Sequence, residues 1–449
     1  MDNSRRKFLE RSSLLAGAGL ATTVPLEAFA TNRKKVSANE KLNFAVIGCK
    51  GMGWSNMRAH FAMDEIECVA LCDVDQNVLE ERAADVEKAR GKKPKLYGDY
   101  RKLLEDKDID AVIIGTPDHW HCLPMIEAVQ AGKHVYVEKP LSNSIGECNL
   151  MLKAAKESKQ MVQVGQWQRS GLQYQKAHEI VNSGVLGNIR LVKVWAYQGW
   201  MKSVPVKPDS APPKGVDYDM WLGPSKKRPF NPNRFHFTFR WFWDYAGGLM
   251  TDWGVHEIDI ALYIMGAVAP KSVMASGGKL AYPDDASETP DTLQAVFEYD
   301  NFSMLWEHAV GIDGGNYGYT EGIAFIGNKG TLVVNRGGLE LIPEKETNDK
   351  GIQVYKTDAI PRQNFRGPSA LERHAANFVE SIKANDRSKL KCWIESGSVA
   401  AINAHMGNIA YKTGRKVYWD KAAGMFKDDK EANAMISPEY HNGWKLPKL

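Results

Sequence analysis

Three ionisable residues of the sequence, Lys139, Asp252 and His256, carry side chains suited to proton transfer at a hydroxyl group. Near neutral pH, histidine is the side chain best matched to accept the proton of a secondary alcohol whose carbon gives up a hydride. A lysine stabilises negative charge on the oxygen and relays protons, and an aspartate orients the histidine or a substrate hydroxyl. The residue types therefore predict His256 as the base, Lys139 as the relay and Asp252 as the orienting group.

The spacing of these residues favours a shared site. Asp252, His256 and Asp259 are separated by four and three residues, which places them on one face of a single expected helix whose other face is apolar. A polar stripe on an apolar helix costs burial energy, so a site is favoured over a core surface. Structural roles stay open for each residue taken alone: Lys139 as a solvated strand end, His256 as a satisfied core histidine and Asp252 as a helix cap.

A glycine turn at residues 48–53 follows an apolar run and precedes a helical pattern. Such a turn lets backbone N–H groups and a helix N-terminus approach a pyrophosphate. Asp73 comes twenty residues after the turn, at the end of the next apolar run, where a carboxylate accepts from both ribose hydroxyls. Lys50 replaces the usual second glycine, so Lys50 or Gly51 must make the closest approach to phosphate. The expected cofactor contacts here are Gly48, Lys50, Gly51, Met52, Gly53 and Asp73.

The same residues favour NAD over NADP as the cofactor. The carboxylate of Asp73 would repel a 2′-phosphate, and the following Val74 offers that phosphate no cation. A glycine turn that merely connects a strand and a helix is the alternative, and the position of Asp73 argues against it.

Two short motifs follow successive apolar runs, at the edge where an open parallel sheet binds ligands. They are GTPDHWH at residues 115–121 and EKP at residues 138–140. They add to the expected cofactor contacts Thr116, Pro117, His121, Glu138 and Lys139.

The crossing between the domains supplies the expected substrate contacts. Gln166, Trp167 and Arg169 follow the sixth apolar run and are expected to contact substrate, together with Asp252 and His256. For Arg169 an interdomain salt bridge is nearly as good an interpretation.

Several further aromatic and histidine residues have two interpretations. Three aromatic residues precede the expected Asp252 helix: Trp241, Trp243 and Tyr245. Either one of them forms an aromatic platform for a sugar, or all three belong to a core. His405, in a late helical stretch, either reaches the cleft or is structural.

The elements that must position these residues follow from the hydrophobic pattern. From residue 42, continuous apolar runs alternate with helical stretches, which predicts a doubly wound parallel sheet over residues 41–164. After residue 164, strand-like runs follow one another with turns between them, which predicts a large open, mostly antiparallel sheet within residues 165–449. Residues 201–240 form an irregular excursion typical of a lid. The helical stretches 371–384 and 397–414 are expected to pack back onto the first domain.

Taken together, the glycine turn, TPxxxH, EKP and GGxxxDxGxHxxD motifs resemble those of the Gfo/Idh/MocA oxidoreductase family. The resemblance covers nearly the whole chain after residue 30. It implies a Rossmann domain that binds NAD or NADP, and a second α/β domain whose sheet forms the interface of a homo-oligomer. It also implies oxidation or reduction of a sugar or cyclitol carbon, with Lys139, Asp252 and His256 matching the family's active-site residues.

The N-terminus indicates export of the folded protein. Residues 1–30 carry paired arginines, a short apolar stretch and an Ala-x-Ala end, which resembles a twin-arginine signal, with 31–40 as a linker. An exported enzyme would have to take up its cofactor in the cytoplasm and keep it tightly bound. The apolar stretch is too short to span a bilayer, so no membrane insertion is expected.

Composition and cysteine spacing narrow the function classes further. A formal net charge of +4 over 449 residues argues against nucleic acid as a partner. The six cysteines contain no CxxC, which predicts buried free thiols and no metal site.

Three functions remain open after this reading of the sequence. The first is an NAD-dependent sugar or cyclitol dehydrogenase. The second is a glycosidase or lyase that oxidises the sugar transiently and restores the cofactor. The third, a non-catalytic nucleotide sensor, is disfavoured by the intact Lys, Asp and His set.

Overall fold

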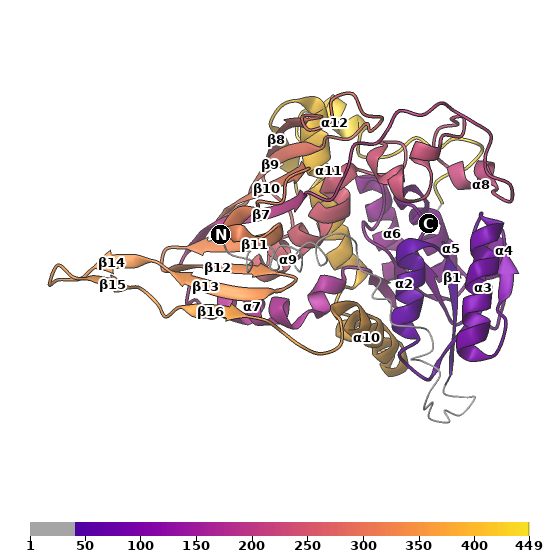
Figure 1. Ribbon diagram of the computed structural model, residues 1–449, viewed down its shortest axis with the longest axis horizontal. Coiled ribbons are helices and arrows are strands. Elements are labelled where there is room, and N and C mark those ends of the chain that lie inside the picture. The colour runs from indigo at the N-terminus through magenta and orange to yellow at the C-terminus, as the bar shows by residue number, and fades with distance from the viewer. Residues whose placement is uncertain (1–40, 448) are drawn as a thin grey trace, which may run out of the picture.

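The computed structural model describes residues 41–447 and 449, and Figure 1 shows two lobes lying side by side. The predicted signal of residues 1–30 and the predicted linker of residues 31–40 lie outside the described residues. The first lobe is built on a parallel sheet, and the second on a larger sheet that carries a projecting hairpin.

Six parallel strands form the first sheet, in the order β3-β2-β1-β4-β5-β6. All four residues of β4 are buried, as expected for a strand covered on both faces, so the predicted doubly wound sheet is confirmed. The strand order reverses between β1 and β4, which opens a crevice at their carboxyl ends. The strands are β1 (Leu42–Ile47), β2 (Ile66–Cys72), β3 (Lys95–Tyr97), β4 (Ala111–Ile114), β5 (His134–Val137) and β6 (Val162–Val164). The helices are α2 (Gly51–His60), α3 (Gln76–Arg90), α4 (Tyr100–Leu104), α5 (Cys122–Gln130) and α6 (Ile145–Glu157).

The second sheet has ten strands in the order β16-β13-β12-β11-β7-β10-β9-β8-β17-β18. Its described strand pairs are antiparallel except for β7 and β10, so the prediction of a large, mostly antiparallel sheet is confirmed. Its strands are β7 (Ile189–Gln198), β8 (Ser272–Gly278), β9 (Thr292–Glu298), β10 (Ser303–Val310), β11 (Glu321–Gly327), β12 (Gly330–Asn335), β13 (Gly338–Pro343), β16 (Ile360–Gln363), β17 (Val417–Asp420) and β18 (Met425–Phe426). The separate hairpin of β14 (Lys345–Thr347) and β15 (Gln353–Tyr355) projects from the lobe (Figure 1).

Helices cover one face of this sheet and form one core with it. Val192 and Val194 of β7 point into that core, whereas Leu191, which directly precedes Val192, is 49% exposed on the opposite face. The covering helices are α7 (Leu172–Asn182), α9 (Val255–Met265) and α11 (Ile394–Thr413).

Two late helices contact the first lobe. Helix α10 (Ala370–Ala384) begins with a capping box formed by Ser369 and Glu372 and packs against α2, where Phe378 enters the core of the first lobe. Helix α11 packs against α6 and ends at Gly414 in the left-handed conformation.

The predicted excursion crosses from the second lobe to the first. It contains α8 (Tyr218–Leu222) and the short helices η5 (Pro232–Arg234) and η6 (His236–Trp241). The amide of Gln76 donates to the Gly215 carbonyl at 2.9 Å, and the amide of Asp217 donates to the Val74 carbonyl at 2.9 Å. The excursion is therefore fixed over the carboxyl ends of β1 and β2.

The C-terminal segment contacts both the excursion and the first lobe. The Tyr440 hydroxyl donates to Glu147 of α6 at 2.6 Å, and the His441 amide donates to the Pro224 carbonyl at 2.9 Å. The ring of Trp444 packs edge-on against Trp120 at 4.9 Å. The end of the chain thus joins the excursion to the first lobe.

Three further features of the described residues bear on function. Within residues 41–447 and 449, no helix combines the length and apolarity needed to cross a bilayer. Over the same residues, no three His, Cys, Asp or Glu side chains are grouped so as to hold a metal ion. All six cysteines are buried and free, as the sequence predicted.

Candidate active site

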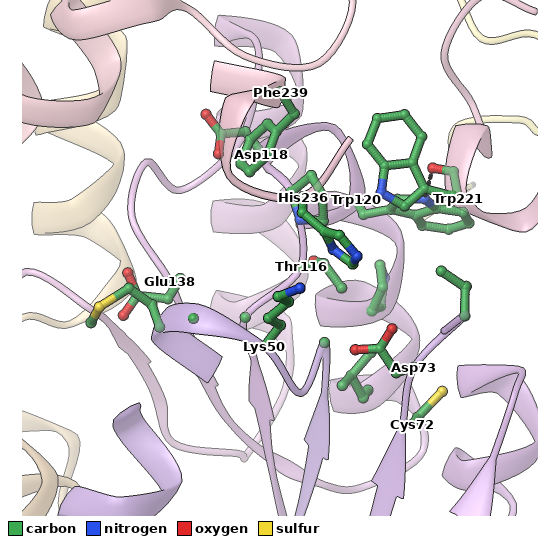
Figure 2. Close-up of a pocket in the computed structure, with 18 of the residues that line it drawn as sticks. Lys50, Cys72, Asp73, Thr116, Asp118, Trp120, Glu138, Trp221, His236 and Phe239 are labelled. Atoms are coloured by element: carbon green, nitrogen blue, oxygen red, sulfur yellow. Dashed lines mark hydrogen bonds between the residues drawn. The ribbon is translucent and has the colours of Figure 1, made fainter. Parts of the chain in front are cut away.

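A cavity of about 450 Å³ lies between the parallel sheet and the excursion, a size typical of ligand sites. Figure 2 shows it lined from below by residues that follow β1, β2, β4 and β5, and from above by the excursion. Of the residues predicted from sequence, those that line it are Gly48, Lys50, Gly51, Met52, Asp73, Thr116, Pro117, Glu138, Lys139 and Asp252.

The glycine turn forms one end of the cavity. A side chain at Gly48, where φ is +83°, would come within 2.7 Å of the Thr116 amide nitrogen, and one at Gly53 within 1.9 Å of the Gly48 carbonyl oxygen. Gly53 does not line the cavity. Its missing side chain lets α2 pack closely on the strand ends. Lys50 precedes α2 without capping it by its side chain, and no acidic residue lies in the first turn. The helix N-terminus therefore keeps backbone donors free for an anion.

Asp73 lies beside the turn and holds it. Its Oδ2 accepts from the Cys49 amide at 2.8 Å and its Oδ1 from the Asp75 amide at 3.0 Å. Burial raises the pKa of Asp73 to about 6, so the side chain is mainly ionised at neutral pH. Each oxygen keeps a lone pair for a ribose hydroxyl. Together with the unpartnered, cavity-lining hydroxyl of Thr116, these groups fit a dinucleotide.

His121 lies behind the cavity wall and Glu138 lines the cavity, and hydrogen bonds hold both side chains in place. His121 places Nδ1 2.7 Å from the Pro140 carbonyl oxygen and Nε2 2.9 Å from that of Thr116, and burial lowers its pKa to about 4. Glu138 Oε1 accepts from the Asn56 side chain at 2.8 Å. His121 does not line the cavity. Its two ring nitrogens contact the loops after β4 and β5, so it links these two loops.

Lys139, Asp252 and Arg240 form an ionic cluster that lines the cavity. Lys139 Nζ lies 2.9 Å from Oδ1 and 3.0 Å from the backbone oxygen of Asp252, and Arg240 Nε lies 3.2 Å from the same Oδ1. Burial alone would raise the pKa of Asp252, but the charges of Lys139 and Arg240 outweigh it and lower this pKa to about 2. Asp252 is therefore a permanent carboxylate that holds two cations in place.

The helix that carries Asp252 differs from the prediction. The expected single α-helix is broken into a π-helical turn, η7 (Met250–Gly254), followed by α9 from Val255. The prediction of one regular α-helix through Asp252 and His256 is therefore wrong, because the turn that carries Asp252 is wider than an α-helical turn. Asp252 lines the cavity beside Lys139, whereas His256 packs against the Trp167 ring at 5.5 Å and does not line it.

His256 is buried, and its Nδ1 has no partner among the described residues. Burial, then the charges of Lys139 and Arg336, hold the pKa of His256 well below its usual range. The imidazole is therefore neutral at physiological pH and free to accept a proton.

The remaining expected substrate contacts point elsewhere. Arg169 makes two 2.8 Å hydrogen bonds to the Asp259 carboxylate in a buried salt bridge, which is the alternative considered for it. The Gln166 side chain donates to the Val255 carbonyl at 3.3 Å. Trp167 stacks against the guanidinium of Arg336 at 4.7 Å. None of the three lines the cavity.

The late aromatic and histidine candidates are mainly structural. Tyr245 is fully buried, Trp243 donates its indole N–H to the Glu288 carbonyl at 3.0 Å, and His405 Nε2 lies 2.9 Å from the Ser142 carbonyl. Trp241 lines a second cavity of about 290 Å³ on the other side of η6.

Two regions of the chain match one family. Residues 42–166 match its "Oxidoreductase family, NAD-binding Rossmann fold", and residues 170–301 match its "Oxidoreductase family, C-terminal alpha/beta domain". The chain belongs to the Gfo/Idh/MocA family. The glycine turn and Lys139 lie within the first matched region, and Asp252 lies within the second.

Relatives with curated names cover different shares of the chain. The uncharacterized oxidoreductase YrbE of Bacillus subtilis is 31% identical over 303 residues, which cover 65% of this chain and 74% of that protein. Myo-inositol 2-dehydrogenase of Thermotoga maritima is 24% identical over 384 residues, which cover 83% of this chain and 94% of that protein. A glycosyl hydrolase family 109 protein of Shewanella pealeana is 33% identical over 165 residues, which cover 33% of this chain and 36% of that protein.

The fold is also shared with solved structures. Levoglucosan dehydrogenase, in complex with NADH and levoglucosan, superposes with a TM-score of 0.61 at 19% identity, over 84% of this chain and 99% of that one. The likeness shows the common architecture of the Gfo/Idh/MocA family.

Sequence reasoning missed several residues that this member of the family brings to the site. Arg240 and several aromatic side chains around the cavity come from the excursion. This segment has no hydrophobic periodicity from which their positions could be predicted. Arg336 comes from the turn between β12 and β13, and only its charge among apolar strand residues could have marked it. The other missed lining residues include Asp118, Trp120, Trp221, Phe235, His236, Phe237 and Phe239.

Proposed function

We propose that this oxidoreductase is exported and transfers a hydride between tightly bound NAD and a secondary hydroxyl of a sugar, glycoside or cyclitol. The observation that carries the proposal is one cavity with two kinds of wall. The glycine turn and Asp73 offer backbone donors and a carboxylate suited to a dinucleotide, and Lys139, Asp252 and Arg240 offer paired charges suited to a polar reacting group.

The chain supplies the binding groups for the nucleotide. The free amides at the start of α2 would bind the pyrophosphate, Asp73 the ribose, and Thr116 with Pro117 the wall beside them. Bound there, NAD would accept the hydride. The negative charge of Asp73 and the absence of a cation at Val74 favour NAD over NADP.

The acid–base work falls to the ionic cluster and its neighbour. The Lys139 ammonium, fixed by Asp252, would stabilise negative charge on the reacting oxygen and pass its proton on. His256 does not line the cavity, so its neutral imidazole would be the final proton acceptor and would receive the proton through Lys139. Arg240 binds the same carboxylate oxygen of Asp252 and helps to keep that carboxylate oriented.

Retention of the cofactor is supported by the excursion that covers it. Phe235, His236 and Phe239 line the upper side of the cavity, and His236 Nε2 lies 3.2 Å from Asp75 Oδ2 of the first lobe. A nucleotide beneath them would leave only after these contacts opened. Loading in the cytoplasm before export agrees with the twin-arginine pattern of the N-terminus.

We further infer a homo-oligomer assembled through the open face of the ten-stranded sheet. Leu191 and Met274 are 49% and 51% exposed on that face. Burial of such side chains in a symmetric interface would remove them from water. Sedimentation of the wild type and of Met274→Lys tests this assembly, and a monomeric wild type would contradict it.

The substrate class is supported by the relatives, two of which carry names of a cyclitol and an anhydrosugar dehydrogenase. The partial match to a family 109 glycosyl hydrolase favours one second candidate, cleavage of a glycoside by transient oxidation with no net change in the cofactor. Both candidates need the same hydride transfer, so they differ in the product and in the final state of the cofactor.

The decisive experiment begins with the nucleotide released by heating purified protein, identified with its redox state. Single-turnover mixing of NAD-loaded protein with sugars, glycosides and inositols then follows nicotinamide absorbance. Net reduction supports the dehydrogenase, and glycoside cleavage with the cofactor returned to its initial state supports the second candidate. A protein that binds NAD but transforms no member of the panel would contradict both and support a nucleotide sensor.

A further inference from the structure

Asp118 is a carboxyl group whose position is fixed by its neighbours. It begins the short helix η3 (Asp118–Trp120) after β4. The next residue, His119, donates its amide to the Tyr245 carbonyl at 3.2 Å, and the Trp120 indole donates to the Trp221 carbonyl at 2.9 Å. Both partners follow the crossing into the second lobe, so the turn that carries Asp118 is clamped between the lobes.

The Asp118 side chain lines the main cavity and is only 7% exposed (Figure 2). Within residues 41–447 and 449, no other residue donates a hydrogen bond to its carboxyl oxygens or pairs with them as a salt bridge. Asp252 and Asp259, in contrast, are each held by a basic side chain. A buried carboxyl group without a partner is costly unless it is neutral or meets a ligand.

The charged groups that face Asp118 come from three segments. Burial raises the pKa of Asp118 to about 8; Arg240 on η6 and Lys139 after β5 oppose the shift, and Asp252 on η7 adds to it. The two cations are already engaged with Asp252, so their attraction does not cancel the effect of burial. At neutral pH the site thus contains two carboxyl groups in different states, an ionised Asp252 and a mainly protonated Asp118.

We propose that Asp118 contacts the substrate directly, as a carboxylic acid that donates a hydrogen bond to an oxygen of a polyhydroxylated substrate in the cavity. The inference rests on the proposed function, because it assigns to Asp118 a specificity role in the same site. A carbonyl oxygen accepts hydrogen bonds but donates none, so a neutral acid binds the ketone form and the developing oxyanion, which a carboxylate would repel. No proton transfer to carbon or covalent step is assigned to Asp118.

This role makes activity depend on pH in a way that a structural role does not. As pH rises through about 8, Asp118 loses its proton, the donor disappears and a negative charge replaces it. The second-order rate constant for nicotinamide reduction, measured with a substrate that reduces the wild type, should therefore fall above that pH.

The test compares Asp118→Asn, Asp118→Ala and the wild type. The amide of Asn keeps a donor at every pH, so Asp118→Asn should remain within about tenfold of the wild type at neutral pH and lose the alkaline fall. Asp118→Ala should lose about tenfold or more at neutral pH. Asp108→Asn is the matched control, since the Asp108 side chain is 75% exposed and should leave the profile unchanged.

Bound nucleotide content and thermal unfolding check that each variant is folded; if Asp118→Ala is not, the isosteric Asn variant alone decides. An alkaline fall that persists unchanged in Asp118→Asn would overturn the proposal, as would full activity of a folded Asp118→Ala. If the wild type reduces NAD with no member of the panel, the proposed function fails and this inference fails with it. If the wild type is active and Asp118→Asn has the same pH profile, the role of Asp118 is refuted and the proposed function still stands.

Discussion

The Lys139 ammonium lies 2.9 Å from Oδ1 and 3.0 Å from the backbone oxygen of Asp252, so a single side chain holds both the carboxylate and the main chain of a π-helical turn. The turn is the point at which the second lobe meets the end of β5. One lysine from the first lobe thus binds both the side chain and the main chain of its counter-ion.

Removal of this lysine should affect chemistry far more than cofactor binding. Lys139→Ala and His256→Ala should each keep NAD affinity within a few-fold and slow single-turnover hydride transfer by about 10²-fold or more. Because both residues act on the same proton, the double variant should lose less than the product of the two effects. Lys153→Ala on α6, where the side chain is 54% exposed, is the control. Wild-type rates in both variants would show that these residues are structural.

Asp73 should set the choice between the two nucleotides. Asp73→Ser removes the negative charge that opposes a 2′-phosphate, so NAD affinity should fall and the preference should move toward NADP. Asp73→Asn is the matched variant, since its amide oxygen can still accept from the Cys49 amide. Titration of the protein with both nucleotides measures the ratio, and an unmoved ratio in both variants would place the ribose elsewhere.

The same residue predicts a pH dependence of binding. Because burial raises the pKa of Asp73 to about 6, the group gains a proton as pH falls through that value and loses its capacity to accept from two ribose hydroxyls. NAD affinity should therefore weaken below about pH 6 in the wild type. The Asn variant should be weaker but flat over this range, and parallel profiles would exclude Asp73 as the titrating group.

The buried Arg169–Asp259 salt bridge should matter for stability. Arg169→Met leaves the Asp259 carboxylate buried without a partner and should lower the free energy of unfolding by about 3–5 kcal/mol, measured with denaturant. Arg169→Met combined with Asp259→Leu should recover much of that loss and keep the rate of hydride transfer. A double variant that is stable but has lost substrate binding would instead support the direct contact expected from sequence.

Export can be tested in the native host. Mature protein should begin at Thr31 and appear outside the cytoplasm, and Arg5→Lys with Arg6→Lys should retain it inside. Unprocessed protein that begins at Met1 would contradict the signal.

The first sheet could be predicted because each of its longer strands contains a continuous run of apolar residues. Val112, Ile113 and Ile114 are consecutive apolar residues, and only a strand buried on both faces explains such a run next to Thr116 and Pro117. The glycine turn and Asp73 follow from the same logic, since their positions at strand ends are local features of the chain. Ten of the expected site residues therefore line one cavity.

The rest of the site could not be predicted from local pattern. The spacing of Asp252 and His256 fits a regular helix, and nothing in that spacing indicates the π-helical turn that carries Asp252 and meets Lys139 of the other lobe. Arg240 lies in a segment without periodicity, and Arg336 reaches Trp167 across the sheet edge. These contacts join residues distant in sequence, which periodicity does not report.

The C-terminal contacts of Tyr440, His441 and Trp444 also set an order of events during synthesis. These residues follow both lobes in the sequence, yet they fasten the excursion to the first lobe. The excursion cannot be fastened until they have been synthesised, and the core of the first lobe itself waits for Phe378 of α10. A nucleotide taken up during synthesis would therefore enter a cavity whose cover is not yet fixed.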